Sequence, residues 1–167
     1  MKRVFLGIGS NLGKRENNIL EAVERIRELV GPVINSSSIY ETEPWGFRSK
    51  KYFLNMVIEV ETKLKPSGLL GRLLMIESLL GRVREGKKYK SRIIDLDILL
   101  YNDKVLESSA LVIPHPMIRE RKFVLVPLCE IAPDIVHPVM KKTISELLKD
   151  CQDKSKIRPH DLSTARP

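Results

Sequence analysis

Hydrophobic residues recur along the chain with the period of a strand in some segments and with the period of a helix in others. Apolar or alternating runs predict strands at 4–8, 33–40, 53–61 and 94–100. Helical spacing predicts two helices, from Ile19 to Val30 and from Pro66 to Leu80, and each is followed by a glycine that ends it. Three shorter apolar segments follow: 105–113 predicts another short strand, 123–131 a part of the core, and 144–148 one or two helical turns. We find no internal repeat, so the pattern predicts a single domain over residues 1–150.

The predicted strand at 94–100 carries two carboxylates. Successive strand side chains point to opposite faces, so Asp95 and Asp97 share one face with Leu99 and Tyr101, whereas Leu100 belongs to the other, apolar face. The two carboxylates then lie roughly 7 Å apart along the strand and repel one another. Mg²⁺, which is held by one or two carboxylates together with water and substrate phosphates, would offset that repulsion. We therefore predict a divalent-cation site; the alternative is an edge strand with a solvated polar face.

A basic segment precedes this strand. It holds six cations within eleven residues, opposed only by Glu85: Arg82, Arg84, Lys87, Lys88, Lys90 and Arg92. A solvated loop would fit such a composition. Beside a metal site, however, the cluster is typical of a clamp for polyphosphate, and a pair of metal ions could hold a transferring phosphoryl group.

Other residues are candidates for binding a flat ligand or a phosphate. Asn55 lies on a strand beside aromatic residues, where its amide suits either the edge of a heterocycle or an ordinary hydrogen bond within a sheet. Trp45, in a loop with Pro44 and Gly46, could cap the sheet or close over a ring. His115 lies between two prolines near Arg121, where an imidazole could help to hold a phosphate or a purine, although a lone histidine is more often structural.

Composition limits these interpretations without choosing among them. The 167 residues are 43% hydrophobic and carry a net charge of +8, which favours an anionic partner of unspecified class. No apolar run is long enough for a membrane span or a signal peptide, and Cys129 and Cys151 lack metal-ligand spacing, so we expect a cytoplasmic protein. Gly7 to Gly13 does not match a dinucleotide fingerprint, because its third glycine is one position late. The tail at 151–167 is polar and aperiodic, and we expect it to be disordered or loosely docked.

Taken together and in order, these motifs resemble those of the 6-hydroxymethyl-7,8-dihydropterin pyrophosphokinases of folate biosynthesis. The resemblance covers nearly everything except the tail and rests on Gly9-Ser10-Asn11-Leu12-Gly13, Tyr40-Glu41-Thr42, Phe53-Leu54-Asn55, Gly81-Arg82-Val83-Arg84, Arg92-Ile93-Ile94-Asp95-Leu96-Asp97, Pro114-His115 and Arg121-Lys122-Phe123. It implies a ferredoxin-like α+β fold, an antiparallel sheet with helices packed on it and mobile loops over the substrates. It also implies transfer of diphosphate from ATP to the pterin hydroxymethyl group, with two Mg²⁺ ions and release of AMP. We expect small-molecule substrates only, no nucleic acid or membrane, and a monomer or weak homodimer.

The resemblance also implies roles for individual residues. Asp95 and Asp97 match the metal ligands, and Arg82 and Arg92 match arginines that reach the phosphates, so that Arg82, Arg92 and Asp97 are the expected catalytic residues. The positions that contact ATP in the family are matched by Glu77, Arg84, Ile98, His115 and Arg121. The pterin site is matched by Thr42, Trp45, Phe53, Asn55 and Phe123, with Phe123 stacked on the ring and Asn55 hydrogen-bonded to it.

The sequence departs from the family at several positions. Tyr89 stands where many members have Trp, Lys90 where a small residue is usual, and Ala110 where some supply an Arg to ATP. Trp45 is larger than the aliphatic residue of some members, which would tighten the pocket. The competing hypothesis is a nucleic-acid-binding module, because ferredoxin-like sheets with basic loops also bind RNA. Against it, aromatic residues make up only 5% of the chain and paired aspartates repel phosphate without a metal. A third hypothesis is a nucleotide sensor without catalysis.

Overall fold

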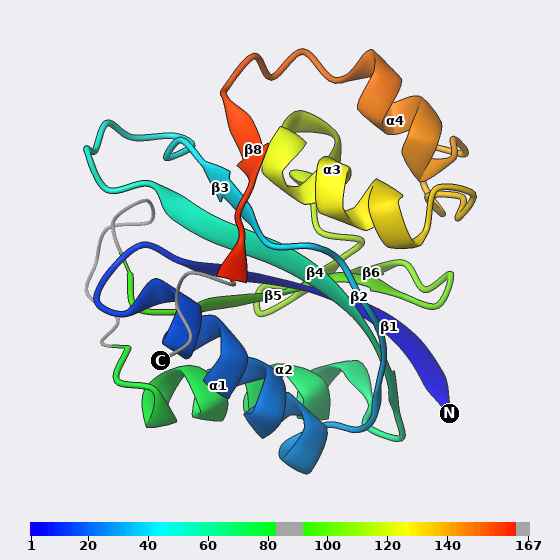
Figure 1. Ribbon diagram of the computed structural model, residues 1–167. Helices are drawn as coiled ribbons and strands as arrows, with labels where there is room; N and C mark the ends of the chain where they lie inside the picture. The colour runs from blue at the N-terminus through cyan, green and yellow to red at the C-terminus, as the bar shows by residue number, and fades with distance from the viewer. Residues whose placement is uncertain (83–91, 163–167) are drawn as a thin grey trace.

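An antiparallel sheet forms the middle layer of the protein, with helices on both faces (Figure 1). The structure is a computed structural model that describes residues 1–82 and 92–162. Its elements in chain order are β1 (Lys2–Ser10), α1 (Arg15–Leu29), β2 (Val33–Ser36), β3 (Tyr40–Thr42), β4 (Phe53–Thr62), α2 (Pro66–Leu79), β5 (Asp95–Tyr101), β6 (Leu106–Glu107), β7 (Val112–Ile113), a 3₁₀ turn (Ile118–Glu120), α3 (Lys122–Ile131), α4 (Ile144–Asp150) and β8 (Ile157–Pro159).

The strand order confirms the expected ferredoxin-like α+β class. The main sheet runs β5-β1-β4-β3-β8, and β2 also pairs with β4. In chain order, β1-α1-β2 is followed by β4-α2-β5, and the strands of the two halves interleave so that β1 lies between β4 and β5 with both pairings antiparallel. The hairpin of β6 and β7 lies outside this sheet.

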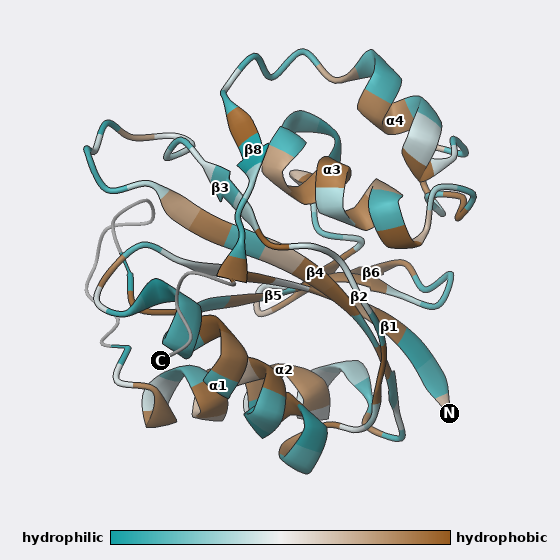
Figure 2. Cartoon of the chain, viewed as in Figure 1, coloured by the Kyte–Doolittle hydropathy of each residue, from teal (hydrophilic) through white to brown (hydrophobic). Residues whose placement is uncertain are grey.

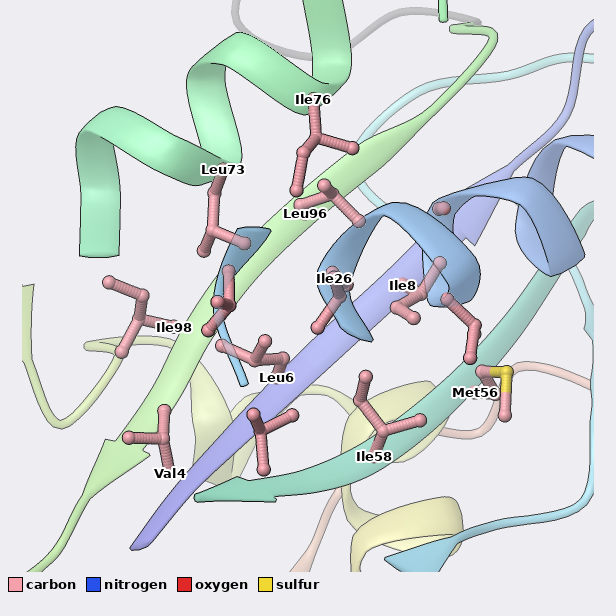
Figure 3. Packing of buried hydrophobic residues seen from close by; sticks show 14 of the residues in the cluster. Val4, Leu6, Ile8, Ile26, Met56, Ile58, Leu73, Ile76, Leu96 and Ile98 are labelled. Carbon is pink, nitrogen blue, oxygen red and sulfur yellow. The ribbon is translucent and has the colours of Figure 1, made fainter. Parts of the chain in front are cut away.

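Two separate apolar cores hold the helices to the sheet. The first lies between the sheet and the pair α1 and α2, and Figure 3 shows side chains of β1, β4 and β5 meeting those of both helices, among them Leu6, Ile26, Ile58 and Leu73. The second joins the opposite face to α3 and α4 through Phe5, Val57, Leu99, Leu125 and Ile144. Figure 2 shows apolar residues along both helices, and the buried ones, among them Ile19, Ile26, Leu69 and Leu73, belong to this first core. Among the described residues, no helix has the length and apolar character needed to cross a membrane.

The predicted alternation of the aspartate-bearing strand is wrong at its C-terminal end. Phe5 pairs with Leu100 and Leu6 with Ile98, so Leu99 is an extra residue, a β-bulge. The inserted residue exchanges the faces of the two residues after it. Leu100 therefore joins Leu99 in the core under α3, and Tyr101 lies in the core of α1 and α2, where its hydroxyl donates to the Leu64 carbonyl over 2.6 Å. The bulge follows Asp95 and Asp97, which keep their shared face.

The single strand predicted at 33–40 is divided into β2 and β3. The interruption has a local cause at Ser37. Its backbone N–H donates to the Val57 carbonyl and its hydroxyl accepts from the Val57 N–H, each over 2.9 Å. A serine side chain thus substitutes for one backbone partner of the ladder and interrupts the strand.

The tail was expected to be disordered or loosely docked, and its described residues 151–162 are docked on the protein. β8 pairs with β3, Asp153 accepts a hydrogen bond of 3.1 Å from the Lys122 backbone N–H, and the His160 N–H donates to the Ile39 carbonyl over 2.8 Å. The exposed Arg158 also forms an ion pair with Glu41. Without β8 the backbone of β3 would be an unpaired edge, so covering it explains why a polar segment is ordered here.

The turn from α1 into β2 provides a test of the packing. A Cβ atom on Gly31 would lie 2.0 Å from the Glu61 carbonyl oxygen, whereas a Cβ on Gly71, in the exposed face of α2, meets nothing within 4 Å. We expect Gly31→Ala to lower the free energy of unfolding by at least about 2 kcal/mol, because backbone must move. The matched change Gly71→Ala should raise it by roughly 0.5–1 kcal/mol. Urea denaturation of both variants is the measurement, and equal midpoints would contradict this packing.

Candidate active site

The candidate site lies on the face of the sheet that packs against α3. It is formed by the same strands as the core under that helix, further along their length. Gly9 of β1 pairs with Asn55 of β4 on one side and with Asp95 of β5 on the other, and Gly7 pairs with Asp97. The two glycines leave the centre of this surface without side chains. A Cβ on Gly9 would lie only 2.6 Å from the Asn55 Oδ1 atom. The glycines of β1 therefore form the floor between an amide on one strand and two carboxylates on the next.

Asp95 is neutralised by two arginines. Its Oδ1 atom lies 2.8 Å from Arg82 Nη1 and 3.1 Å from Arg92 Nη1. Arg82 also forms an ion pair with Glu77, whose side chain is 2% exposed and accepts a hydrogen bond of 2.9 Å from the Leu96 N–H. Burial opposes the charged Arg82, yet Asp95 and Glu77 outweigh it and raise its pKa above the ordinary value. The negative charge of Asp95 is thus fully compensated.

Backbone contacts hold both arginines in place. Gly81, with φ of +93°, ends α2 and lets the Arg82 N–H donate to the Glu77 carbonyl over 3.0 Å, which turns Arg82 back toward that helix. Arg92 is fixed by Asn11. Its N–H donates to Asn11 Oδ1 over 2.7 Å, and its carbonyl accepts from the Asn11 N–H over 3.1 Å. Both guanidinium groups are therefore positioned by the chain as well as by their charge.

Asp97 differs from its neighbour. Burial first, and then the charge of Asp95, raise the pKa of Asp97 to about 8, although Arg121 and Arg92 act in the opposite direction. Within residues 1–82 and 92–162, no ion pair involves Asp97 and no cluster of three or more His, Cys, Asp or Glu side chains could bind a metal. Two carboxylates with one charge uncompensated fit Mg²⁺, which takes its remaining ligands from water and phosphates.

A polar pair and aromatic rings occupy the neighbouring strand ends. Asn55 is 7% exposed and Thr42 is 2% exposed, and the Asn55 amide donates to the Thr42 hydroxyl over 2.7 Å. Phe53 meets Phe47 edge to face, with 6.2 Å between ring centroids. One N–H of the Asn55 amide donates to Thr42, which fixes the amide with its Oδ1 acceptor directed at the glycine floor.

Arg121, which directly precedes α3, contacts two more rings. Its guanidinium carbon lies 4.7 Å from the ring centroid of Trp45 and 5.6 Å from that of Phe123. Both distances are within the range of cation–π interactions. Arg121 therefore contacts two aromatic rings and also interacts electrostatically with Asp97.

The comparisons with known proteins agree with this geometry. Residues 5–133 match the family model described as 7,8-dihydro-6-hydroxymethylpterin-pyrophosphokinase. The chain belongs to this family. Two relatives, both called 2-amino-4-hydroxy-6-hydroxymethyldihydropteridine pyrophosphokinase, come from Aquifex aeolicus, with 40% identity over 87% of this chain and 90% of that protein, and from Methylorubrum extorquens, with 44% identity over 89% and 92%.

Other matches are longer proteins that contain a pyrophosphokinase-like part. The folic acid synthesis protein fol1 of Pneumocystis carinii is 41% identical over 98% of this chain, which corresponds to 21% of its own length. Among solved structures, an HPPK-DHPS in complex with substrates matches 90% of this chain and 45% of its own, with a TM-score of 0.72 and 17% identity. This last likeness supports the fold alone.

The structure brings together most of the residues that the resemblance placed in the pyrophosphokinase site. The acidic and basic group is assembled from Glu77, Arg82, Arg92, Asp95 and Asp97. Two further contacts join expected residues: Asn55 with Thr42, and Arg121 with Trp45 and Phe123.

Three further residues were expected in the site, Ile98, His115 and Arg84, and three of the positions that depart from the family are Ala110, Tyr89 and Lys90. Ile98 is 4% exposed and its side chain packs in the core of α1 and α2, so only its backbone could meet a nucleotide. His115 is anchored to β5 by its N–H, which donates to the Leu99 carbonyl over 2.9 Å. Ala110 is exposed between β6 and β7. Arg84 lies outside the described residues, as do Tyr89 and Lys90.

Sequence analysis missed the roles of Gly7, Gly9 and Asn11. The glycines had been weighed only as part of a dinucleotide loop, and Asn11 only as part of a motif. The available signal was their spacing: Gly7 and Gly9 repeat with the same period of two as Asp95 and Asp97, which is expected when two strands pair face to face.

Replacing Asp97 by asparagine should stabilise the protein in the absence of ligands. The carboxyl has a pKa of 3.8 when unfolded and about 8 when folded. Between these values the folded state binds more protons, so this group lowers stability as pH rises. Asp97→Asn should therefore raise the free energy of unfolding by on the order of 1–2 kcal/mol at pH 8 and by little at pH 4. Urea denaturation at both pH values tests this, with Asp134→Asn at an exposed position as the control. If Asp97→Asn is instead less stable than the native protein at pH 8, burial and the charge of Asp95 do not destabilise the ionised Asp97 carboxylate.

The glycine floor makes a second prediction. Gly9→Ala places a methyl group against Asn55 Oδ1, whereas a Cβ on Gly7 would lie 3.5 Å from Leu99, an ordinary contact. We expect Gly9→Ala to weaken binding of 6-hydroxymethylpterin by roughly tenfold, the equivalent of one good hydrogen bond. Gly7→Ala should bind the ring normally. Calorimetric titration of both variants provides the measurement, and equal affinities would mean that Asn55 does not bind the ring.

Proposed function

We propose that this protein transfers diphosphate from ATP to the hydroxymethyl group of 6-hydroxymethyl-7,8-dihydropterin and releases AMP, using the residues of the candidate active site. Membership of the pyrophosphokinase family supports the reaction. The observation that carries the assignment of residues is the arrangement around Gly9. Carboxylates and arginines that suit metal and phosphates stand on one side, and the buried Asn55 amide stands on the other.

Asp95 and Asp97 are the proposed metal ligands. They would hold Mg²⁺, which would supply positive charge against the charge that develops on the phosphates. Arg82 and Arg92 are already directed at this position through Asp95. In the proposal, they exchange the Asp95 carboxylate for phosphate oxygens, and Glu77 keeps Arg82 oriented during the exchange.

The ring of the second substrate is assigned to the neighbouring group. Asn55 Oδ1 accepts an N–H from the heterocycle while Thr42 fixes the amide orientation, and Phe123 and Trp45 offer ring faces for stacking. The hydroxyl oxygen then forms a bond to the β-phosphorus, the bond from that phosphorus to the bridging oxygen of the α-phosphate breaks, and AMP carries the electron pair away. The hydroxyl gives up its proton in the process. Such a reaction requires alignment and charge compensation rather than a covalent nucleophile.

Further features belong to the same proposal. We propose two Mg²⁺ ions, because one pair of carboxylates can share two cations across a polyphosphate. We also propose a monomer or weak homodimer that acts in the cytoplasm, where the thiols of Cys129 and Cys151, which form no disulfide, would remain reduced. The nucleic-acid-binding alternative is not supported by any of the relatives named in the comparisons.

The test is an AMP-release assay with ATP, Mg²⁺ and 6-hydroxymethyl-7,8-dihydropterin. Asp97→Asn should lower kcat at least about a hundredfold, because a metal ligand is lost while the fold is retained. Arg92→Ala should lower kcat while the Kd of the pterin stays within about threefold, as expected for a contact made with the transferring phosphates. Lys142→Ala, which removes an exposed ion pair with Asp150, is the control. If the native protein binds ATP without releasing AMP, it is a nucleotide sensor and the proposal fails.

A further inference from the structure

Arg121 occupies an unusual position for a phosphate-binding residue. Its guanidinium group lies over the rings of Trp45 and Phe123, at 4.7 and 5.6 Å from their centroids. Its Nε atom is buried and has no hydrogen-bond partner among the described residues. Burying a hydrogen-bond donor without an acceptor is unfavourable. A ligand that offered an acceptor to Nε could therefore replace the two rings as the partner of Arg121.

The guanidinium group has the shape of a small flat ligand. It is planar and stacks on aromatic faces as a heterocycle does. Under the proposed function, Phe123 and Trp45 are the faces on which the pterin ring stacks. In this structure, Arg121 therefore takes up stacking surface that the substrate requires.

The carboxylates of the site also attract the Arg121 side chain. Arg121 interacts electrostatically with Asp97, so its charge already lies in the field of the carboxylates to which the triphosphate would come. A triphosphate offers charge-assisted acceptors for the guanidinium, including for its unsatisfied Nε–H, and these are stronger partners than a ring face.

We propose that Arg121 is an internal occupant of the ring-binding position, held there by Trp45, and that the triphosphate of the nucleotide draws it away and so exposes the stacking surface. The inference rests on the proposed function and adds to it a specificity-determining role for Trp45. Cation–π attraction is strongest for tryptophan, so this residue lengthens the time that Arg121 spends on the rings. Arg121 then links the two substrates, since the nucleotide removes the competitor of the pterin.

The first experiment measures binding of 6-hydroxymethylpterin to the full chain by calorimetry without nucleotide. Arg121→Ala removes the competitor and should bind this probe at least about threefold more tightly than the native protein, the scale of one cation–π contact. With Mg²⁺ and saturating α,β-methylene-ATP, the native protein should gain affinity for the probe by a similar factor and the variant should not. Arg3→Ala is the matched control, because Arg3 lies over the Phe5 ring at 5.1 Å from its centroid and belongs to the opposite end of β1.

The second experiment follows the fluorescence of the native protein, with Arg121→Ala for comparison. Trp45 is the single tryptophan of the chain, so its fluorescence reports on the ring that Arg121 covers. Adding Mg²⁺ and α,β-methylene-ATP to the native protein should shift its emission, and Arg121→Ala should start from a different emission and show no such shift.

The outcomes separate this inference from the proposed function. If AMP is formed normally, but Arg121→Ala binds the pterin no more tightly and the nucleotide leaves Trp45 emission unchanged, Arg121 is not an occupant of the ring position. If the native protein neither forms AMP nor binds the pterin with nucleotide present, the proposed function itself is wrong and this inference falls with it.

Discussion

The site depends on two carboxylates held on one face of a strand, next to a strand that has glycine at both of the paired positions. The register between β1 and β5 sets Asp95 against Gly9 and Asp97 against Gly7, so no side chain of β1 separates the charges from the surface. Charge compensation is unequal. Asp95 meets two arginines, whereas burial and its neighbour disfavour the ionised form of Asp97. Because this demand for positive charge is built into the strand pairing, it exists before any ligand arrives.

The compensating groups come from the ends of elements rather than from their middles. Arg82 follows the glycine that ends α2, Arg92 precedes β5 and is tied to Asn11 after β1, and Arg121 precedes α3. Each side chain is attached to a rigid element by one short connection. A site of this kind combines a fixed floor with cations that can exchange partners without disturbing either apolar core.

Periodicity was sufficient to predict α1, α2, the main strands and the shared face of Asp95 and Asp97, because these depend only on neighbours in sequence, whereas α3 was predicted only as an apolar segment. It could not predict the bulge at Leu99, which depends on how β5 aligns with β1, or the order of the tail, which depends on the exposed edge of β3. The clamp between Asn11 and Arg92 joins residues 81 positions apart. The carboxylate pair and the basic cluster were predicted from the sequence pattern. For Asn55 and Trp45 the pattern left a binding role and an ordinary structural role both open, and only the family resemblance chose between them.

The pairing of Asp95 with both arginines has a consequence for how metal and nucleotide enter. Under the proposed function, a metal ion that came alone would meet Asp95 already paired with two arginines, and a triphosphate that came alone would meet those arginines already paired. If both came together, Asp95 and Asp97 would be available to hold the metal while Arg82 and Arg92 held the phosphates, so each group that lost a partner would gain another. The ion pairs of Asp95 would therefore favour the metal–nucleotide complex over either component.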